Sequence, residues 1–253
     1  MVDGSRACVN EELDISVEFL VARLWCGQGL SSLQGMTEET TAGERERGWR
    51  GSAELWLGGA HAMLVEGGVE SVKIGALAER LGLSRTSFYW HFADREALLA
   101  ALVRRWQETN TAALLARLEV PTATVTEAIL RLFDAWVDPG LFDSRAEFAM
   151  RTWALTDGGV AEVLAAEDAR RMAAMARLFL RFGFDATEAD TRARTVYLTQ
   201  VGYIALRSDE DFETRMVRIP AYALVFTGQA PTEAEISAFR ARHRLRSGAA
   251  EAP

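Results

Sequence analysis

The residues with the clearest capacity for chemistry lie between positions 85 and 91. This stretch carries arginine, hydroxyl, aromatic and histidine side chains in quick succession: Arg85, Thr86, Ser87, Tyr89, Trp90 and His91. Arginine pairs with guanine through two hydrogen bonds, serine and threonine reach bases or phosphates, and tyrosine and histidine donate to phosphates. Because only Phe88 and Phe92 clearly suit a core, the segment makes poor core material. Its content therefore favours contact with a nucleic acid.

Two short helices would position these side chains. Apolar residues at helical spacing predict a helix over residues 72–81 that ends at Gly82. Ser84 is suited to cap a second helix over residues 85–92. This is the spacing of a helix-turn-helix, in which the first helix braces the second so that its leading side chains enter the major groove. An ordinary helical hairpin has the same spacing, so spacing alone leaves both interpretations open.

The rest of the chain also predicts helices and no strands, so the expected fold class is all-α. A first helix is expected over residues 52–66, and Asp94 begins a long helix toward Leu118. Glycines and capping-box spacings at Thr124, Ser144, Thr187 and Thr232 place the later helices at 125–137, 145–155, 160–182, 187–207 and 209–226, with a last short helix after Thr232. Gly158-Gly159 is expected to break the chain, and Pro220 to kink or split the helix that contains it.

Composition indicates a folded globular protein. The chain has 253 residues, of which 49% are apolar and 25% are charged, as in ordinary domains. No uncharged apolar stretch approaches the roughly 18 residues that span a bilayer, and the acidic N-terminus does not suit a secretory signal. We therefore expect a cytoplasmic protein without a membrane partner. Cys8 and Cys26 are too few for a disulfide framework.

The charge distribution leaves one segment open to an anionic partner. The net charge of −8 argues against nucleic acid, but residues 1–43 alone contribute −5. Residues 44–108 balance nine bases against nine acids. This middle segment is therefore the only plausible seat of an anion-binding face.

Enzyme chemistry finds little support. Histidine occurs only at His61, His91 and His243, and no H-E-x-x-H, G-x-S-x-G or phosphate-loop motif is present. We expect no catalytic residue, no metal site and no cofactor.

A set of short motifs resembles a known family. They are Gly68-Val69, Leu77-Ala78, Leu81-Gly82-Leu83-Ser84, Phe88-Tyr89-x-His91-Phe92 and Asp94-Arg95-Glu96-x-Leu98. Over residues 52–99 this set is similar to the DNA-binding head of TetR-type (TetR/AcrR) transcriptional regulators. The resemblance implies a three-helix helix-turn-helix head followed by a larger helical ligand-binding and dimerisation domain. It also implies a homodimer that binds a near-palindromic DNA operator, usually as a repressor, and releases it when a small-molecule effector binds.

The resemblance assigns roles to individual residues of the head. Arg85, Thr86 and Ser87 occupy base-reading positions, and Tyr89 and His91 take backbone-contact positions. Further DNA contacts are expected from Trp90, Lys73, Arg95 and, in the segment before the first helix, Arg47 and Arg50. Thr86 stands where many members have glycine, so the operator sequence cannot be borrowed from relatives. Packing against neighbouring helices is the alternative role for Tyr89 and His91.

The larger domain offers weaker signals. An apolar pocket is expected among the residues Trp106, Phe133, Trp136, Met150, Arg151, Trp153, Met172, Met175 and Phe179. An inward-pointing Arg151 would favour an anionic ligand, although side chains of this kind at helical spacing also build a plain core. A seam for pairing of two subunits is expected at Val196, Gln200, Tyr203, Ile204, Phe212, Met216, Ile219 and Ala223, and packing within one chain would need the same stripe.

The expected organisation has four parts. They are an N-terminal extension at 1–43, the helix-turn-helix head at 44–98, the ligand-binding and dimerisation domain at 99–230, and a short helix and tail at 231–253. The acidic net charge and Thr86 keep an alternative open, namely a helical ligand-binding or interaction adaptor that has lost specific DNA binding.

Overall fold

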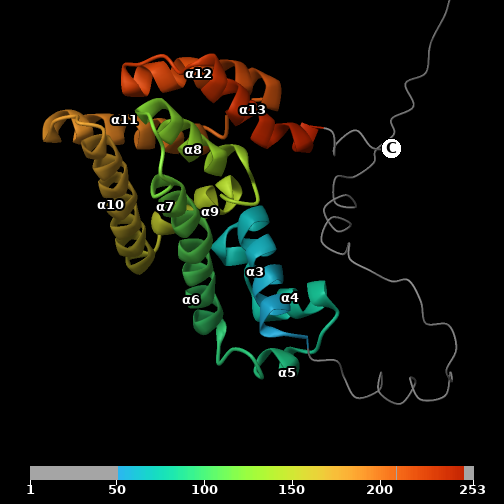
Figure 1. Ribbon diagram of the computed structural model, residues 1–253. Helices are drawn as coiled ribbons and strands as arrows, with labels where there is room; N and C mark the ends of the chain where they lie inside the picture. The colour runs from blue at the N-terminus through green and yellow to red at the C-terminus, as the bar shows by residue number, and fades with distance from the viewer. Residues whose placement is uncertain (1–50, 209, 248–253) are drawn as a thin grey trace, which may run out of the picture. The chain divides into compact units, whose positions relative to one another are not determined.

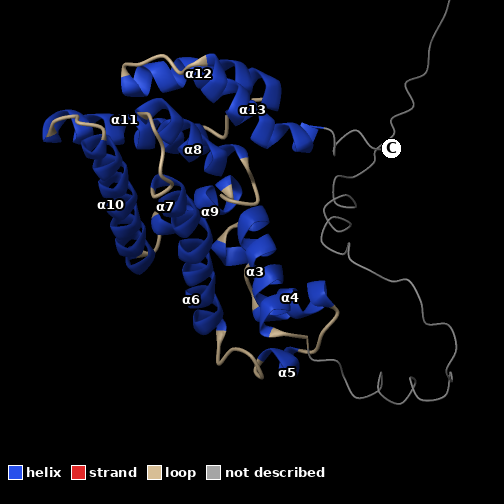
Figure 2. Ribbon diagram, viewed as in Figure 1, coloured by secondary structure: helices blue, strands red, loops and turns tan. Residues whose placement is uncertain are grey.

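The computed structural model describes residues 51–208 and 210–247, and within these ranges the chain forms helices and no strands (Figures 1 and 2). None of the helices in these ranges combines the length and apolar character that a bilayer span requires. The expected N-terminal extension at 1–43 lies outside the described residues. The all-α fold class is confirmed.

The head contains three helices joined by tight connections. They are α3 (Ala53–Gly67), α4 (Ile74–Leu81) and α5 (Arg85–Phe88), with the 3-10 turn η1 (Val69–Ser71) between the first two. Ser52 and Ser84 cap α3 and α5 by accepting backbone N–H groups. Gly82 ends α4 in the left-handed conformation, with φ of 64°, which glycine adopts without steric cost.

The helix that was expected over residues 85–92 is shorter than predicted. Regular α-helix ends at Phe88, and the chain continues as a turn held by hydrogen bonds from His91 N–H and Phe92 N–H to the Phe88 carbonyl. Aromatic residues have weak helix propensity, and the next capping residue, Asp94, is close by.

A single long helical segment leads out of the head. It consists of α6 (Arg95–Trp106), the π-helical stretch η2 (Gln107–Thr111) and α7 (Ala112–Leu118). Its two ends agree with the long helix predicted from Asp94 toward Leu118. The wider π turn places the polar residues Asn110 and Thr111 in the interior, where both are fully buried. Asn110 donates to Glu147, and Thr111 accepts from Arg171.

Six further helices complete the described chain. They are α8 (Val125–Val137), α9 (Ser144–Ala154), α10 (Gly158–Arg181), α11 (Ala186–Ala205), α12 (Phe212–Thr227) and α13 (Glu233–Ser247). Helix α8 matches its predicted bounds, and α12 accommodates Pro220 within one helix. The predicted Thr232–Glu235 capping box is confirmed by reciprocal hydrogen bonds. The helix that it begins is longer than the short one expected.

Three predicted helix starts were wrong in detail because aspartate, not a hydroxyl or a glycine, sets the boundary. Asp143 caps α9, Asp157 caps α10 and Asp185 caps α11. Gly158-Gly159 therefore opens α10 and does not break the chain. Each aspartate carboxylate accepts N–H groups at the helix start, where its negative charge is also favoured by the helix dipole.

Two apolar clusters hold these helices together. One joins α7 and α8 with α10, α11, α12 and α13. The other contains the core of the head, including Trp56 and Phe88, but extends to Met150 and Trp153 of α9 and to Val160 of α10. The helices from α6 to α13 are called the body. Because the second cluster spans head and body, helix α3 is packed directly on α9.

Candidate nucleic-acid interface

Phe88 anchors the short helix α5 in the head. Its ring is completely buried. The ring centre lies 5.4 Å from that of Trp56, in an edge-on arrangement, and 5.6 Å from that of Phe92, in a stacked one. Aromatic pairs of this geometry add to the stabilisation from apolar burial. The anchor fixes which side of α5 faces out.

The outward edge of α5 and its turn carries four of the predicted DNA-contacting residues. Arg85 and Thr86 are exposed at the start of the helix, and Tyr89 and Trp90 are 58% and 64% exposed in the turn. Two large aromatic side chains this open to solvent are unusual for a domain that needs them only as core. The arrangement offers donors and flat apolar surfaces on one edge.

Ser87 does not belong to that edge. Its side chain is buried, and its hydroxyl donates to the Ser84 carbonyl at 2.7 Å. The prediction that Ser87 reads bases is therefore not supported by its position, because position 87 lies on the same inner side of the helix as the Phe88 anchor.

Two cations, Lys73 and Arg85, lie at helix α4. Lys73 is exposed directly before α4 and makes no side-chain cap there. Arg85 lies across α4, where a Cβ atom built on Gly75 would approach Arg85 Nη2 within 2.6 Å. Glycine at position 75 therefore gives the arginine side chain room on the surface of α4.

Arg95 has a structural role that the sequence did not indicate. Its Nε donates to the Val72 carbonyl at 2.6 Å and its Nη2 donates to the Val69 carbonyl at 2.8 Å. These bonds tie the start of α6 to the connection between α3 and α4. His91 is half-buried, and its Nε2 atom is covered and has no hydrogen-bond partner in the described part of the chain. DNA contact by either residue stays a prediction, as it does for Arg47 and Arg50, which lie outside the described residues.

Arg151, the residue expected to attract an anionic ligand if it pointed inward, does point inward. It is already neutralised, because it donates to Glu147 at 2.9 Å and to Asp168 at 2.8 and 3.0 Å. Arg171, completely buried, donates to the same Glu147 at 2.8 Å. The hydroxyl of Tyr197 donates to Asp168 and accepts from both arginines, and burial raises its pKa.

Glu147 is the centre of this buried network. Its side chain is 1% exposed and accepts hydrogen bonds from Trp106 and Asn110 as well as from the two arginines. Burial by itself would raise the pKa of Glu147, but Arg171 and Arg151 outweigh that effect and hold the pKa below its usual value. Sequence reasoning missed Glu147 and Arg171. The local signals that pointed to ion pairs were the spacing of Glu147 to Arg151 and of Asp168 to Arg171.

A second polar contact connects head and body. His61 Nε2 of α3 lies 3.3 Å from the carboxylate of Asp143, the residue that caps α9. Burial works to raise the pKa of Asp143, but the hydrogen bonds from His61 and from two backbone N–H groups lower it overall.

Most of the residues expected to line a pocket are core residues. Trp106, Met150, Trp153, Met175 and Phe179 are buried in the two apolar clusters, and Met172 is half-buried against the first. Phe133 and Trp136 border a cavity of only about 40 Å³ with Tyr203 and Tyr222. A larger cleft, of about 630 Å³, lies elsewhere, between the end of α3, α9 and the end of α11.

Most residues of the predicted subunit seam are buried within this chain. Val196, Ile204, Met216, Ile219 and Ala223 are buried within this chain, and Phe212 packs partly against the same cluster. Gln200 and Tyr203 border the cavities just described. The stripe satisfies packing between α8, α10, α11 and α12, which was the alternative left open by the sequence.

Comparison with known proteins places the head in a family. Residues 57–102 match the family model described as bacterial regulatory proteins, tetR family. The match covers the helix-turn-helix head and the start of α6. A search of curated proteins finds no match to this chain.

Solved structures of related fold are distant in sequence. A transcriptional regulator of the TerR/AcrR family from Aquifex aeolicus is 13% identical, with a TM-score of 0.53 over 70% of this chain and 96% of that chain. A putative TetR-family regulator from a Rhodococcus species is 18% identical, with a TM-score of 0.49 over 69% of this chain and 97% of that chain. The Aquifex structure shows that this chain shares the helical fold of that regulator beyond the head.

Proposed function

We propose that this chain is a TetR-family transcriptional regulator that binds a near-palindromic operator as a homodimer, acts as a repressor, and is released by a small molecule. The observation that carries DNA binding is the exposed edge of α5, where Arg85, Thr86, Tyr89 and Trp90 project from a helix fixed by a buried Phe88. In this proposal Arg85 and Thr86 enter the major groove, and Tyr89, Trp90 and Lys73 contact the sugar-phosphate backbone.

A gel-shift titration with DNA that flanks the protein's own gene tests this proposal. Nanomolar binding that weakens steeply with salt is the expected result, because phosphate contacts release counterions. Binding no tighter than to random DNA of equal length would instead favour an adaptor without an operator.

Point variants separate base reading from backbone contact. Arg85→Ala should reduce the discrimination between operator and random DNA by about 1 to 3 kcal/mol, whereas Tyr89→Phe should weaken binding to both DNAs alike. Arg240→Ala is the matched control, since Arg240 is an exposed arginine on α13, outside the head. An Arg85→Ala protein with intact discrimination would refute the role given to that residue.

The proposed dimer uses the outward face of α11 and α12. Leu198 on α11 is 58% exposed, and Val217, Leu224 and Val225 on α12 are 72%, 45% and 67% exposed. On α11 the hydroxyls of Thr191, Thr195 and Thr199 each donate to the carbonyl four residues earlier. Their methyl groups are therefore free to pack against another helix. Gly202, further along this helix, has open space at its Cβ position, which permits a close approach.

Sedimentation equilibrium of the full chain tests the dimer. Leu198→Glu and Leu224→Glu should each shift the chain toward monomer, because a carboxylate would be desolvated at the contact. Leu180→Glu is the control, since Leu180 is 46% exposed on α10. If both face variants remained dimeric at the wild-type dissociation constant, the dimer contact would lie elsewhere.

A further inference from the structure

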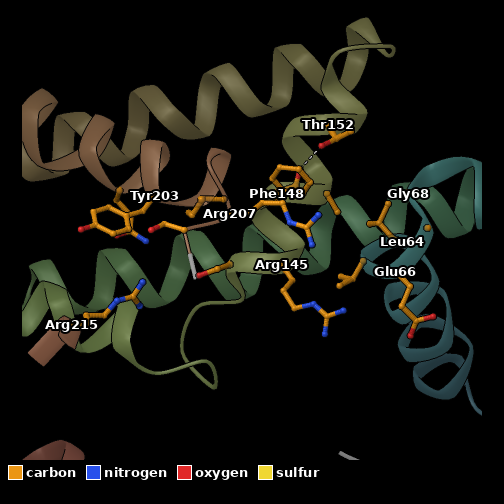
Figure 3. Close-up of a pocket in the computed structure, with 16 residues that line it drawn as sticks. Leu64, Glu66, Gly68, Arg145, Phe148, Thr152, Tyr203, Arg207 and Arg215 are labelled. Atoms are coloured by element: carbon orange, nitrogen blue, oxygen red, sulfur yellow. Dashed lines mark hydrogen bonds between the residues drawn. The ribbon is translucent and has the colours of Figure 1, made fainter. Parts of the chain in front are cut away.

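A large cleft in the described part of the chain lies where the head meets the body. Its walls come from the C-terminal end of α3 with Gly67 and Gly68, from the first turns of α9, and from the end of α11 with the start of α12. The volume of about 630 Å³ is in the range of sites that take small organic ligands. Figure 3 shows Phe148 and Arg207 side by side in this cleft, with Leu64 and Gly68 of the head beside them.

Three arginines give the cleft a positive charge. Arg145, Arg207 and Arg215 line it together with a single acid, Glu66. The Glu66 carboxylate is already bound by Arg80, which donates to both of its oxygens. Within residues 51–208 and 210–247, Arg145 and Arg207 form no ion pair with a carboxylate. The cleft therefore holds two arginines without an ion pair among the described residues, although Arg145 lies close enough to Glu66 to help lower the pKa of that carboxyl group.

Arg207 stands in a conformation that its own side chain disfavours. Its φ is 48°, the one positive φ of a non-glycine residue in the described ranges. The Arg207 N–H bonds to the Ile204 carbonyl and the Ser208 N–H to the Tyr203 carbonyl, which is the Schellman arrangement that usually ends in glycine. A strained residue that points into a cleft marks a functional candidate. The guanidinium lies 5.5 Å from the centre of the Phe148 ring, so an apolar wall holds it in place.

The remaining walls are mostly apolar or neutral. Leu64, Phe148, Ala149 and Ile204 supply apolar surface, and Thr152, Gln200 and Tyr203 supply hydrogen-bonding groups. Arg215 is partly engaged, since it lies 5.9 Å from the centre of the Tyr203 ring. A fitting ligand combines an anionic group with an apolar body.

We propose that this cleft binds an amphiphilic organic anion, a carboxylate or a phosphate monoester, whose charged group pairs with Arg145 and Arg207 and whose apolar part covers Leu64 and Phe148. This inference rests on the proposed function, because it names the class of the small-molecule effector. The same ligand would span helix α3 of the head and helices α9 and α11 of the body.

The position of the cleft couples the ligand to the DNA-reading edge. Gly67 and Gly68 lie directly before η1, and the carbonyls at Val69 and Val72 are held by Arg95 of α6. Helix α4, which braces α5, begins two residues after Val72. A ligand that fixes the end of α3 relative to α9 therefore biases the orientation of the whole reading edge.

Thermal-shift and calorimetric titrations of the full chain test the proposal with three probes of equal chain length: octanoate, octyl phosphate and octanol. Octanoate or octyl phosphate should raise the melting temperature and bind measurably, whereas octanol should do neither at the same concentration. If only one anion binds, the result identifies the head group. If neither anion binds, or if octanol performs as well as the anions, the proposal is overturned.

The Arg207→Gly variant locates the site without a risk of misfolding. Glycine suits a φ of 48°, so the variant should fold at least as stably as wild type. It should bind the effective anion at least about tenfold more weakly, as expected for loss of a charge-assisted hydrogen bond. Arg145→Gln should act in the same direction, and Arg240→Ala should bind like wild type. Wild-type affinity in both Arg207→Gly and Arg145→Gln would place the anion elsewhere and refute the assignment.

A gel shift of ligand-free protein separates this inference from the proposed function. Operator binding that is unaffected by a saturating, cleft-bound anion would refute the effector role. Absence of operator binding in the ligand-free protein would refute the proposed function and leave the anion titration to be judged independently.

Discussion

Replacing Glu147 with alanine should destabilise the protein more than any change at the surface. The substitution removes the carboxylate that faces two arginines, one of which, Arg171, is completely buried. Arg171 would keep Thr111 and Tyr197 as neutral partners, but its positive charge would lose the nearest counter-ion. The Trp106 indole N–H would lose its acceptor in the interior. Breaking a buried ion pair by removing one partner typically costs about 3 to 5 kcal/mol.

That magnitude is readily measured. For a chain of this size, about 3 to 5 kcal/mol corresponds to a fall of about 6 to 20 °C in melting temperature. Urea unfolding followed by far-ultraviolet circular dichroism gives the free energy, and calorimetry gives the melting temperature. Glu162→Ala is the control, because Glu162 is an exposed glutamate on α10 and its loss should change stability by no more than about 0.5 kcal/mol. A Glu147→Ala loss below about 1 kcal/mol would refute the reasoning that the buried arginines depend on this carboxylate.

Gly82→Ala should destabilise the head by about 1 kcal/mol, because φ at Gly82 is 64°. Gly58→Ala in the interior of α3 should stabilise it by up to about 1 kcal/mol, because alanine is the better helix former. Neither added Cβ meets another atom, so urea unfolding of the two variants measures the backbone effect alone. Arg95→Ala should lower the melting temperature by freeing the Val69 and Val72 carbonyls, and an unchanged melting temperature with weaker, less salt-dependent DNA binding would show that Arg95 acts only on phosphate. Asp143 and Glu147 have lowered pKa values in the folded chain, so each stabilises the fold above its ordinary pKa of 3.8 or 4.5. This stabilisation is lost as the pH falls through the pKa of the folded state. The midpoint of urea unfolding should therefore fall less steeply between pH 7 and pH 3 in Glu147→Gln than in wild type.

Sequence reasoning succeeded where the determinant was local. Helix α8 was placed at its observed bounds because the Thr124 cap and an apolar stripe lie within one segment. The turn at Gly82 and the capping box at Thr232 were found for the same reason. Helix starts at Asp143, Asp157 and Asp185 were missed because serine, threonine and glycine nearby offered competing local signals.

The errors at the candidate site arose where the outcome depends on which face of a helix turns inward. Periodicity identified an apolar stripe with Ile219 and Ala223 on α12, but it could not distinguish packing within a chain from packing between chains. Ser87 was taken as a reader because hydroxyl groups suit bases, yet its neighbour Phe88 is the anchor that rotates position 87 inward. Only the tertiary core around Trp56 sets that rotation.

Buried arginines and cleft arginines differ in what they indicate about a ligand. A buried guanidinium cannot be neutralised by deprotonation in a protein, so it must bring carboxylates with it, as Arg151 and Arg171 do with Glu147 and Asp168. An arginine that points into the core is therefore poor grounds for expecting an anionic ligand, because the core has already supplied the anions. Arg145 and Arg207 border a cleft that is open to solvent, where a cation can persist without a fixed partner until a soluble anion binds. The charge that can select an effector lies at the head–body junction and not in the centre of the helical body.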